Sequence, residues 1–172
     1  MQIRQTNITD HEAVRELYKT VARISGGIAR KEFEISDEYI QNFMQKSLKN
    51  GVELVAEDNG KIVGEVHSYS FGIDCFKHTL GDTTICIHPD YQGIGLGKKL
   101  FSALLEFVAI QRKDILRVEL HARSTNKAAI AMYQKIGFEI EGQAKGRVLE
   151  PDGSLVADVP MAWLNPNFIQ HP

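Results

Sequence analysis

A glycine-rich hexapeptide constrains the fold of this chain more than any other feature. Residues 92–97 read Gln-Gly-Ile-Gly-Leu-Gly, and they lie between a strand-like segment, 79–88, and an amphipathic helix-like segment, 95–111. Alternating glycines let successive backbone N–H groups converge, and the following helix adds unpaired amides and the positive end of its dipole. Lys98 and Lys99 add full charges. The turn therefore predicts a site for a phosphate or pyrophosphate, with a purely structural tight turn as the alternative.

Two other nucleotide-binding motifs fit this turn less well. A phosphate-loop motif needs Gly-Lys followed by Ser or Thr, and no such triplet occurs here. The dinucleotide fingerprint needs a third glycine where this chain has Lys98 or Leu100, although Glu119 lies roughly twenty residues on, like the ribose-binding acid of that motif. An NAD-dependent oxidoreductase therefore stays open as an alternative.

Hydrophobic periodicity and turn residues predict the remaining elements. Alternating apolar residues indicate strands, apolar residues at helical spacing indicate helices, and Asp58-Asn59-Gly60 is typical of a tight hairpin turn. Together they indicate an α/β (α+β) fold in a single domain spanning residues 1–172. The expected strands are 2–6, 52–57, 61–69, 79–88, 115–121, 138–149 and 154–163, and the expected helices are 10–24, 36–49, 95–111 and 126–136.

Composition excludes several classes of protein. The 172 residues carry a formal net charge of −2 and no block of like charges, so no nucleic-acid footprint is visible. No apolar run resembles a signal peptide or a membrane span, so we expect a cytoplasmic protein with no membrane partner. Cys75 and Cys86 lie eleven positions apart, without zinc or redox spacing, so no metal is expected.

A second group of residues lies on the predicted helix 126–136. Asn126, Ile130 and Tyr133 are four and then three positions apart, which aligns them on one helical face. Asn126 and Tyr133 would lie about 10 Å apart along the axis, a span that suits an elongated ligand. The structural alternatives are an N-cap role for Asn126 and a core role for Tyr133.

Segments 85–97 and 126–138 together resemble the two signature segments of the GNAT superfamily of N-acetyltransferases. The first is similar to its Gln/Arg-x-x-Gly-x-Gly loop, and the second to its Asn-x-x-Ala-Ile-x-x-Tyr-x-x-x-Gly-Phe segment. The resemblance implies an enzyme that moves an acetyl group from acetyl-CoA to a primary amine on a small molecule, peptide or protein. It also implies a mixed, largely antiparallel central sheet of about seven strands flanked by about four helices, and a possible homodimer.

The resemblance also implies roles for individual residues. The main chain of 85–87 would pair with the pantetheine arm and polarise the thioester, and the amides of 92–98 would hold the pyrophosphate. Asn126 would anchor the pantetheine, and Tyr133 would protonate the departing coenzyme A thiolate. The implied cofactor-binding residues are Ile85, Cys86, Ile87, Gln92, Gly93, Ile94, Gly95, Leu96, Gly97, Lys98, Asn126, Ala129 and Tyr133.

The reaction also needs a neutral amine, because a protonated amine has no lone pair to attack with. A lysine-like amine is almost entirely protonated at pH 7, so a general base must accept its proton. Glu65, Glu119 and His121 lie on predicted strands and are the candidate bases, each with a solvated or hydrogen-bonded strand residue as the alternative. A non-catalytic acyl-CoA binding or sensing domain also stays open.

Overall fold

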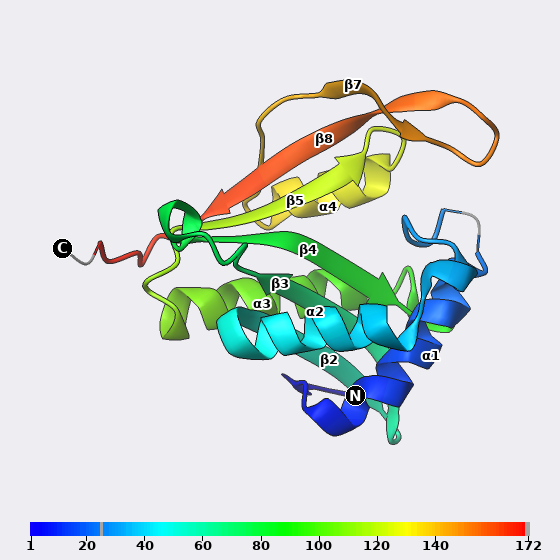
Figure 1. The fold of residues 1–172 in the computed structure, drawn as a ribbon, viewed down its shortest axis with the longest axis horizontal. Helices are drawn as coiled ribbons and strands as arrows, with labels where there is room; N and C mark the ends of the chain where they lie inside the picture. Colours follow the sequence, from blue (N-terminus) through cyan, green and yellow to red (C-terminus); the bar gives the residue numbers. More distant parts are fainter. Residues whose placement is uncertain (25, 171–172) are drawn as a thin grey trace.

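The computed structural model describes residues 1–24 and 26–170 and is built on one eight-stranded sheet (Figure 1). The strand order is β1-β2-β3-β4-β5-β8-β6, with β7 also paired to β8. β4 and β5 run parallel, and the other pairs are antiparallel. The strands are β1 Gln2–Gln5, β2 Gly51–Asp58, β3 Lys61–Tyr69, β4 Thr79–Ile87, β5 Arg117–Arg123, β6 Glu139–Ile140, β7 Ala144–Leu149 and β8 Leu155–Leu164.

Four α-helices cover this sheet, and the predicted mixed, largely antiparallel fold is confirmed. They are α1 His11–Ala22, α2 Asp37–Asn50, α3 Leu96–Gln111 and α4 Lys127–Lys135. One strand prediction needs correction, because the expected strand 138–149 is divided into β6 and β7. Both pair with β8 at separate positions along its length, which explains eight strands instead of about seven.

The sheet opens between β4 and β5. These strands pair only at Thr79 with Arg117 and at Leu80 with Val118, and beyond that point they diverge (Figure 1). The β3–β4 register is shifted just past this point, and Asp82 adopts a left-handed φ of 50°. A bulge of this kind bends its strand, so it helps to turn β4 away from β5. The sheet is thus wedge-shaped at the carboxyl ends of β4 and β5.

Two apolar layers hold the helices on the sheet. α3 packs on one face of β2–β4, where Leu100 and Leu104 meet buried sheet residues such as Val66. α1 and α2 cover the opposite face (Figure 1), where Val14 and Phe43 pack in a second core. The central side chains of β2 and β3 are therefore buried on both faces of the sheet. No helix in the described part of the chain is long and apolar enough to cross a membrane.

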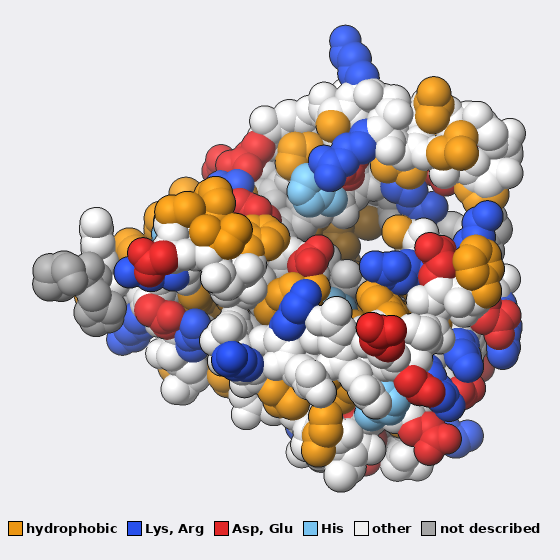
Figure 2. Space-filling model, viewed as in Figure 1, with side chains coloured by type: hydrophobic (Ala, Val, Ile, Leu, Met, Phe, Trp, Pro, Cys, Tyr) orange, Lys and Arg blue, Asp and Glu red, His pale blue; other side chains and the backbone are white. Residues whose placement is uncertain are grey.

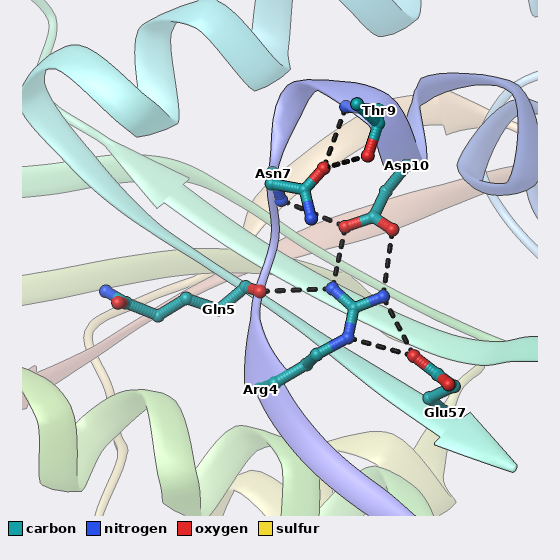
Figure 3. A network of polar contacts seen from close by, with 6 residues as sticks. All are labelled: Arg4, Gln5, Asn7, Thr9, Asp10 and Glu57. Atoms are coloured by element: carbon teal, nitrogen blue, oxygen red, sulfur yellow. Dashed lines mark hydrogen bonds and ion pairs between the residues drawn. The ribbon is translucent and has the colours of Figure 1, made fainter. Parts of the chain in front are cut away.

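An ion-pair network fastens the N-terminal strand to this sheet (Figure 3). Arg4 on β1 donates to both carboxylate oxygens of Asp10, at 2.7 and 2.8 Å, and to Glu57 on β2 at 2.9 Å. The hydrogen bonds from Arg4 hold the pKa of Asp10 below its ordinary value. Because Asp10 directly precedes α1, the network fixes where α1 begins against the sheet.

The segment between α1 and α2 lies at the open end of the wedge (Figure 1). Arg123, the last residue of β5, donates from Nη2 to the Gly26 carbonyl oxygen at 2.6 Å. Ser36 ends the segment and caps α2, because its hydroxyl accepts from the Tyr39 amide at 3.1 Å. The segment is thereby fastened to β5 near one end and to α2 at the other.

Candidate active site

A cavity of about 540 Å³ occupies the wedge between β4 and β5. Figure 2 shows this face of the molecule hollowed between the part built on β5 and β8 and the part built on α1 and α2. The sequence-predicted residues that line it come from β4, the glycine turn, β5 and α4. They are Ile85, Ile87, Gln92, Gly97, His121, Asn126, Ala129 and Tyr133.

The β4 edge facing this cavity has free main-chain groups. His88 donates its amide to Val63 on β3, and alternate residues of an antiparallel strand point their N–H groups in the same direction. Ile85 and Ile87 therefore point theirs toward the wedge, where β5 is no longer paired. The Ile87 carbonyl oxygen accepts from Gln92 Nε2 at 3.0 Å, so the turn is fastened to the same edge. An extended ligand could pair with this edge as a further strand would.

The glycine turn has the conformation that the sequence predicts. Gly93 and Gly95 have left-handed φ values of 75° and 82°, and a Cβ added at either would meet nothing within 4 Å. Glycine is therefore needed there for backbone conformation and not for packing. Gly95 caps α3 without a side-chain hydrogen bond, so no side chain occupies the first amides of the helix. Lys98 is exposed in that first turn.

Some predicted cofactor residues contribute only their main chain. Cys86 and Leu96 are buried in the two opposite cores, so their side chains point away from the cavity. Gly93, Ile94 and Gly95 lie in the turn and are exposed. The predicted roles of these residues were backbone roles, which this placement allows.

Tyr133 and Asn126 each have the structural role that the sequence offered as an alternative, and each also lines the cavity. Tyr133 is 8% exposed, packs against Phe101 and Phe138 at ring distances of 5.3 and 5.9 Å, and also lines the cavity. Burial raises the pKa of Tyr133 to about 12, so its hydroxyl keeps its proton at neutral pH. Asn126 accepts from the Ala129 amide at 3.1 Å as the α4 cap, and it too lines the cavity.

The three candidate bases have different surroundings. His121 lines the cavity, with Nδ1 2.9 Å from Asp158 Oδ2 on β8. Glu119 is on the same face of β5 as His121. It is adjacent to Val118, the last β5 residue that pairs with β4, so it lies where the wedge has not yet opened. It forms an ion pair with Arg117 and does not line the cavity. Glu65 is fully buried beneath α1. The structure therefore brings only His121 of these three to the wedge cavity.

A second cavity of about 380 Å³ adjoins the first. The two share Ile28, Ala29 and Thr84 in their walls. The rest of the second wall is rich in aromatic and charged side chains. It consists of Tyr18, Arg30, Glu34, Tyr39, Phe43, His67, Tyr69 and Asp82.

His67 is the functional candidate that the sequence analysis missed. A signal was present, because residues two apart on a strand face the same side and His67 follows Glu65 at that spacing. Its partners come from α1, α2 and β4, and no sequence pattern predicted how these elements pack against β3. Within residues 1–24 and 26–170, no group of three or more His, Cys, Asp or Glu side chains is placed to hold a metal ion.

The fold and the cavity define a class of domain with room for an elongated ligand between two diverging strands. Residues 49–140 match the acetyltransferase (GNAT) domain family. The L-amino acid N-acyltransferase MnaT of Escherichia coli (strain K12) is 31% identical over 147 residues, covering 83% of this chain and 82% of that protein. The L-methionine sulfoximine/L-methionine sulfone acetyltransferase of Salmonella typhimurium is 28% identical over the same shares of both chains.

A solved structure shows the same fold. The putative acetyltransferase yncA from Salmonella typhimurium, determined with its cofactor acetyl-CoA, superposes with a TM-score of 0.83. It is 23% identical, and the match covers 100% of this chain and 96% of that one. The chain belongs to the GNAT family, and it is therefore an acetyl-CoA-dependent N-acetyltransferase. The oxidoreductase and sensor alternatives are set aside on this ground.

Proposed function

We propose that this enzyme transfers an acetyl group to a primary amine by direct attack on acetyl-CoA, with Tyr133 as general acid. The observation that carries the proposal is the wedge cavity, whose wall runs from the glycine turn along the free edge of β4 to Tyr133. Acetyl-CoA would place its pyrophosphate on the amides of 92–98 and its pantetheine arm along Ile85 and Ile87. Tyr133 would then protonate the departing thiolate.

Direct attack also agrees with the surroundings of the cysteines. Cys86 lies on β4, along which the pantetheine arm is proposed to bind, but its side chain is buried in the core beneath α1 and α2. Burial raises the pKa of the Cys86 thiol well above its ordinary value, so little nucleophilic thiolate forms. Cys75 is exposed and lines neither cavity. A covalent acetyl-cysteine intermediate is therefore not part of the proposal.

The acceptor in this proposal is a free amino acid or a related small amine that carries a carboxylate. Arg30 in the second cavity stacks over the Tyr39 ring at 4.0 Å, and no ion pair joins it to a carboxylate of the described residues. A bound carboxylate could pair with this guanidinium. The relatives whose names specify amino-acid substrates support the same class. Cytoplasmic location and homodimer formation stay predictions of the sequence.

An acceptor panel tests this function. Free L-amino acids, the amines that lack their carboxylate, and short peptides are each incubated with acetyl-CoA, and coenzyme A thiol release and acetylated product are measured. We expect the amino acids to give the highest kcat/KM. A panel without any acetylated product would exclude the proposed function, and a preference for peptides would move the acceptor class to polypeptides.

Replacing Tyr133 tests the general acid. Tyr133→Phe is expected to lower kcat by roughly 10²- to 10⁴-fold, the usual contribution of a positioned proton donor, while the Kd for acetyl-CoA stays within about threefold. Tyr91→Phe is the matched control, because Tyr91 donates to Asp58 outside both cavities and should keep its kcat. An unchanged kcat in Tyr133→Phe would assign the proton to another donor.

A further inference from the structure

We infer that the second cavity holds the acceptor amine and that His67 is its general base, oriented by the buried pair Glu65 and Tyr18. The inference rests on the proposed function, since it names the residue that makes the amine nucleophilic. His67 was outside the set of candidate bases from the sequence. Three observations support the assignment: the contacts of His67, its position on β3 next to β4, and the charged groups around it.

The contacts of His67 leave one ring nitrogen for a ligand. Nδ1 lies 3.0 Å from Glu65 Oε1 and 3.4 Å from Tyr18 Oη, and the Tyr18 hydroxyl donates to Glu65 Oε2 at 2.6 Å. A carboxylate oxygen accepts, so we assign the imidazole proton to Nδ1 for this contact. Nε2 then carries the lone pair, and His67 lines the second cavity. Glu65 lines neither cavity, so it acts through His67.

Aromatic packing fixes the plane of the imidazole. The ring stacks on Phe43 with centroids 4.1 Å apart and an interplanar angle of 14°. Tyr69 is nearly parallel to it, at 5.9 Å and 12°. His67 is only 2% exposed, and Glu65 and Tyr18 are completely buried. The ring is therefore held by packing on α2 and β3 and by hydrogen bonds within the core, the arrangement that an oriented base needs.

The position of His67 places it where the two cavities meet. His67 on β3 is the cross-strand partner of Thr84 on β4, so their side chains lie on the same face of the sheet. Thr84 lines both cavities. It directly precedes Ile85, whose amide faces the first cavity, where acetyl-CoA is proposed to bind. An amine held by His67 would therefore lie next to the edge of β4 on which the thioester is expected.

Among the described residues, neutral side chains pack around His67 next to a single contacting carboxyl group. Burial raises the pKa of Tyr18 and of Tyr39 above the ordinary value, so both hydroxyls stay neutral. Burial likewise raises the pKa of the Cys86 thiol, which stays neutral as well. Glu65 is the carboxylate in direct contact, and it would stabilise the imidazolium as the proton arrives.

Five further charged or titratable groups surround His67 or line its cavity. Two of them are Tyr69, which stacks on the imidazole, and Glu34, which accepts from the Lys31 amide at 2.8 Å. Glu53 on β2 is the cross-strand partner of His67 on β3. Burial, and to a smaller extent the nearby Glu65 charge, raises the pKa of Glu53 to about 9, so Glu53 is neutral at pH 7. Asp82 on β4 accepts from the Tyr69 hydroxyl at 2.7 Å, and Arg30 lies over Tyr39. Arg30 is thus the cation in this wall that is available to an acceptor carboxylate.

The proposed step transfers the acetyl group to the amine and releases one proton. The acceptor ammonium gives one proton to His67 Nε2, and its freed lone pair forms the C–N bond with the thioester carbonyl carbon. The C–S bond then breaks, and the thiolate takes the Tyr133 proton. The second proton lost by the amine nitrogen restores Tyr133 through the solvent of the cavity, and His67 releases its proton to water. The products are the amide, coenzyme A thiol and one proton.

Two variants with one control test the assignment, using the best acceptor from the panel. His67→Gln is expected to lower kcat/KM by roughly 10²- to 10³-fold, with acetyl-CoA affinity unchanged. His67→Ala should be at least as impaired and should regain activity when free imidazole is added, which a purely structural role would not allow. His78→Gln is the control, because His78 lies outside both cavities.

Glu65→Gln tests the positioning of His67 through the pH profile. Removing the negative charge next to His67 should lower kcat/KM by about tenfold and move the acidic limb of its pH profile to lower pH, because the imidazolium loses its counter-charge. Melting temperature and acetyl-CoA affinity are measured in parallel. If the His67 variants do not fold, the shift of this limb in Glu65→Gln decides the question instead, and an unmoved limb would overturn the assignment.

The two proposals fail in different ways. A wild-type enzyme that acetylates no amine refutes the proposed function. An active wild type with full activity in folded His67→Gln refutes only the assignment of the base. Loss of activity in His121→Gln together with full activity in His67→Gln would move that role to the pair of His121 and Asp158.

Discussion

Two buried glutamates on neighbouring strands have different hydrogen-bonding environments. Glu65 on β3 accepts from Tyr18, whereas neither carboxyl oxygen of Glu53 on β2 has a hydrogen-bond partner in the described chain. Burial is the main cause that raises the pKa of Glu53 to about 9, and the Glu65 charge adds to it. A neutral carboxyl costs less to bury than a carboxylate, so Glu53 keeps a proton that the unfolded chain would lose.

The free energy of unfolding should therefore depend on pH through Glu53. Between the ordinary pKa of 4.5 and about 9, the folded protein binds a proton that the unfolded chain has released, so stability falls as pH rises. Glu53→Gln should flatten this slope by up to about 1.4 kcal/mol per pH unit, as measured by urea unfolding at several pH values. Glu106→Gln, at an exposed position on α3, is the control. Parallel stability curves for wild type and Glu53→Gln would contradict the prediction.

At the scale of single elements, the strand–turn–helix β4–α3 was predicted from its own residues. Its glycines, its proline-ended strand and its apolar helix face are local signals, and they lie within one continuous stretch of chain. The division of 138–149 into β6 and β7 was not predicted. It depends on where each short strand meets β8, which is a tertiary property.

The glycine turn should be sensitive to an added methyl group. Gly95→Ala forces a residue with a Cβ into a left-handed conformation, so we expect a loss of about 1–2 kcal/mol in stability and weaker acetyl-CoA binding. Thermal unfolding and calorimetric titration measure the two effects. Gly142→Ala is the matched control, because Gly142 has no left-handed φ and an added Cβ there meets nothing within 4 Å. Equal behaviour of the two variants would argue against the assigned backbone role.

At the scale of the whole molecule, the sheet consists of two parts that meet along only two residue pairs of β4 and β5. The first cavity is walled by both parts, with β4 on one side and β5 and α4 on the other. A ligand bound there bridges them, so it should add to the stability of the entire fold and not only of the loop that it touches.

Acetyl-CoA should therefore raise the melting temperature, and NAD should not. A ligand present at 100 times its Kd stabilises the folded state by about 2.7 kcal/mol. For a chain of this length that corresponds to roughly 5–10 °C. Differential scanning measurements with each ligand at equal concentration check this, and an equal shift with NAD would place a dinucleotide in the wedge.

The sequence by itself determined the order of the elements up to residue 137, the glycine turn and the alignment of Asn126 with Tyr133, because each depends on residues close together along the chain. Only the tertiary structure decided which polar side chains reach the cavities. Strand pairing set where β4 and β5 diverge, and this separates His121 from Glu119 although both lie on one face of β5. His67, Tyr18 and Glu65 meet because α1 packs across β3, a contact between segments almost fifty residues apart.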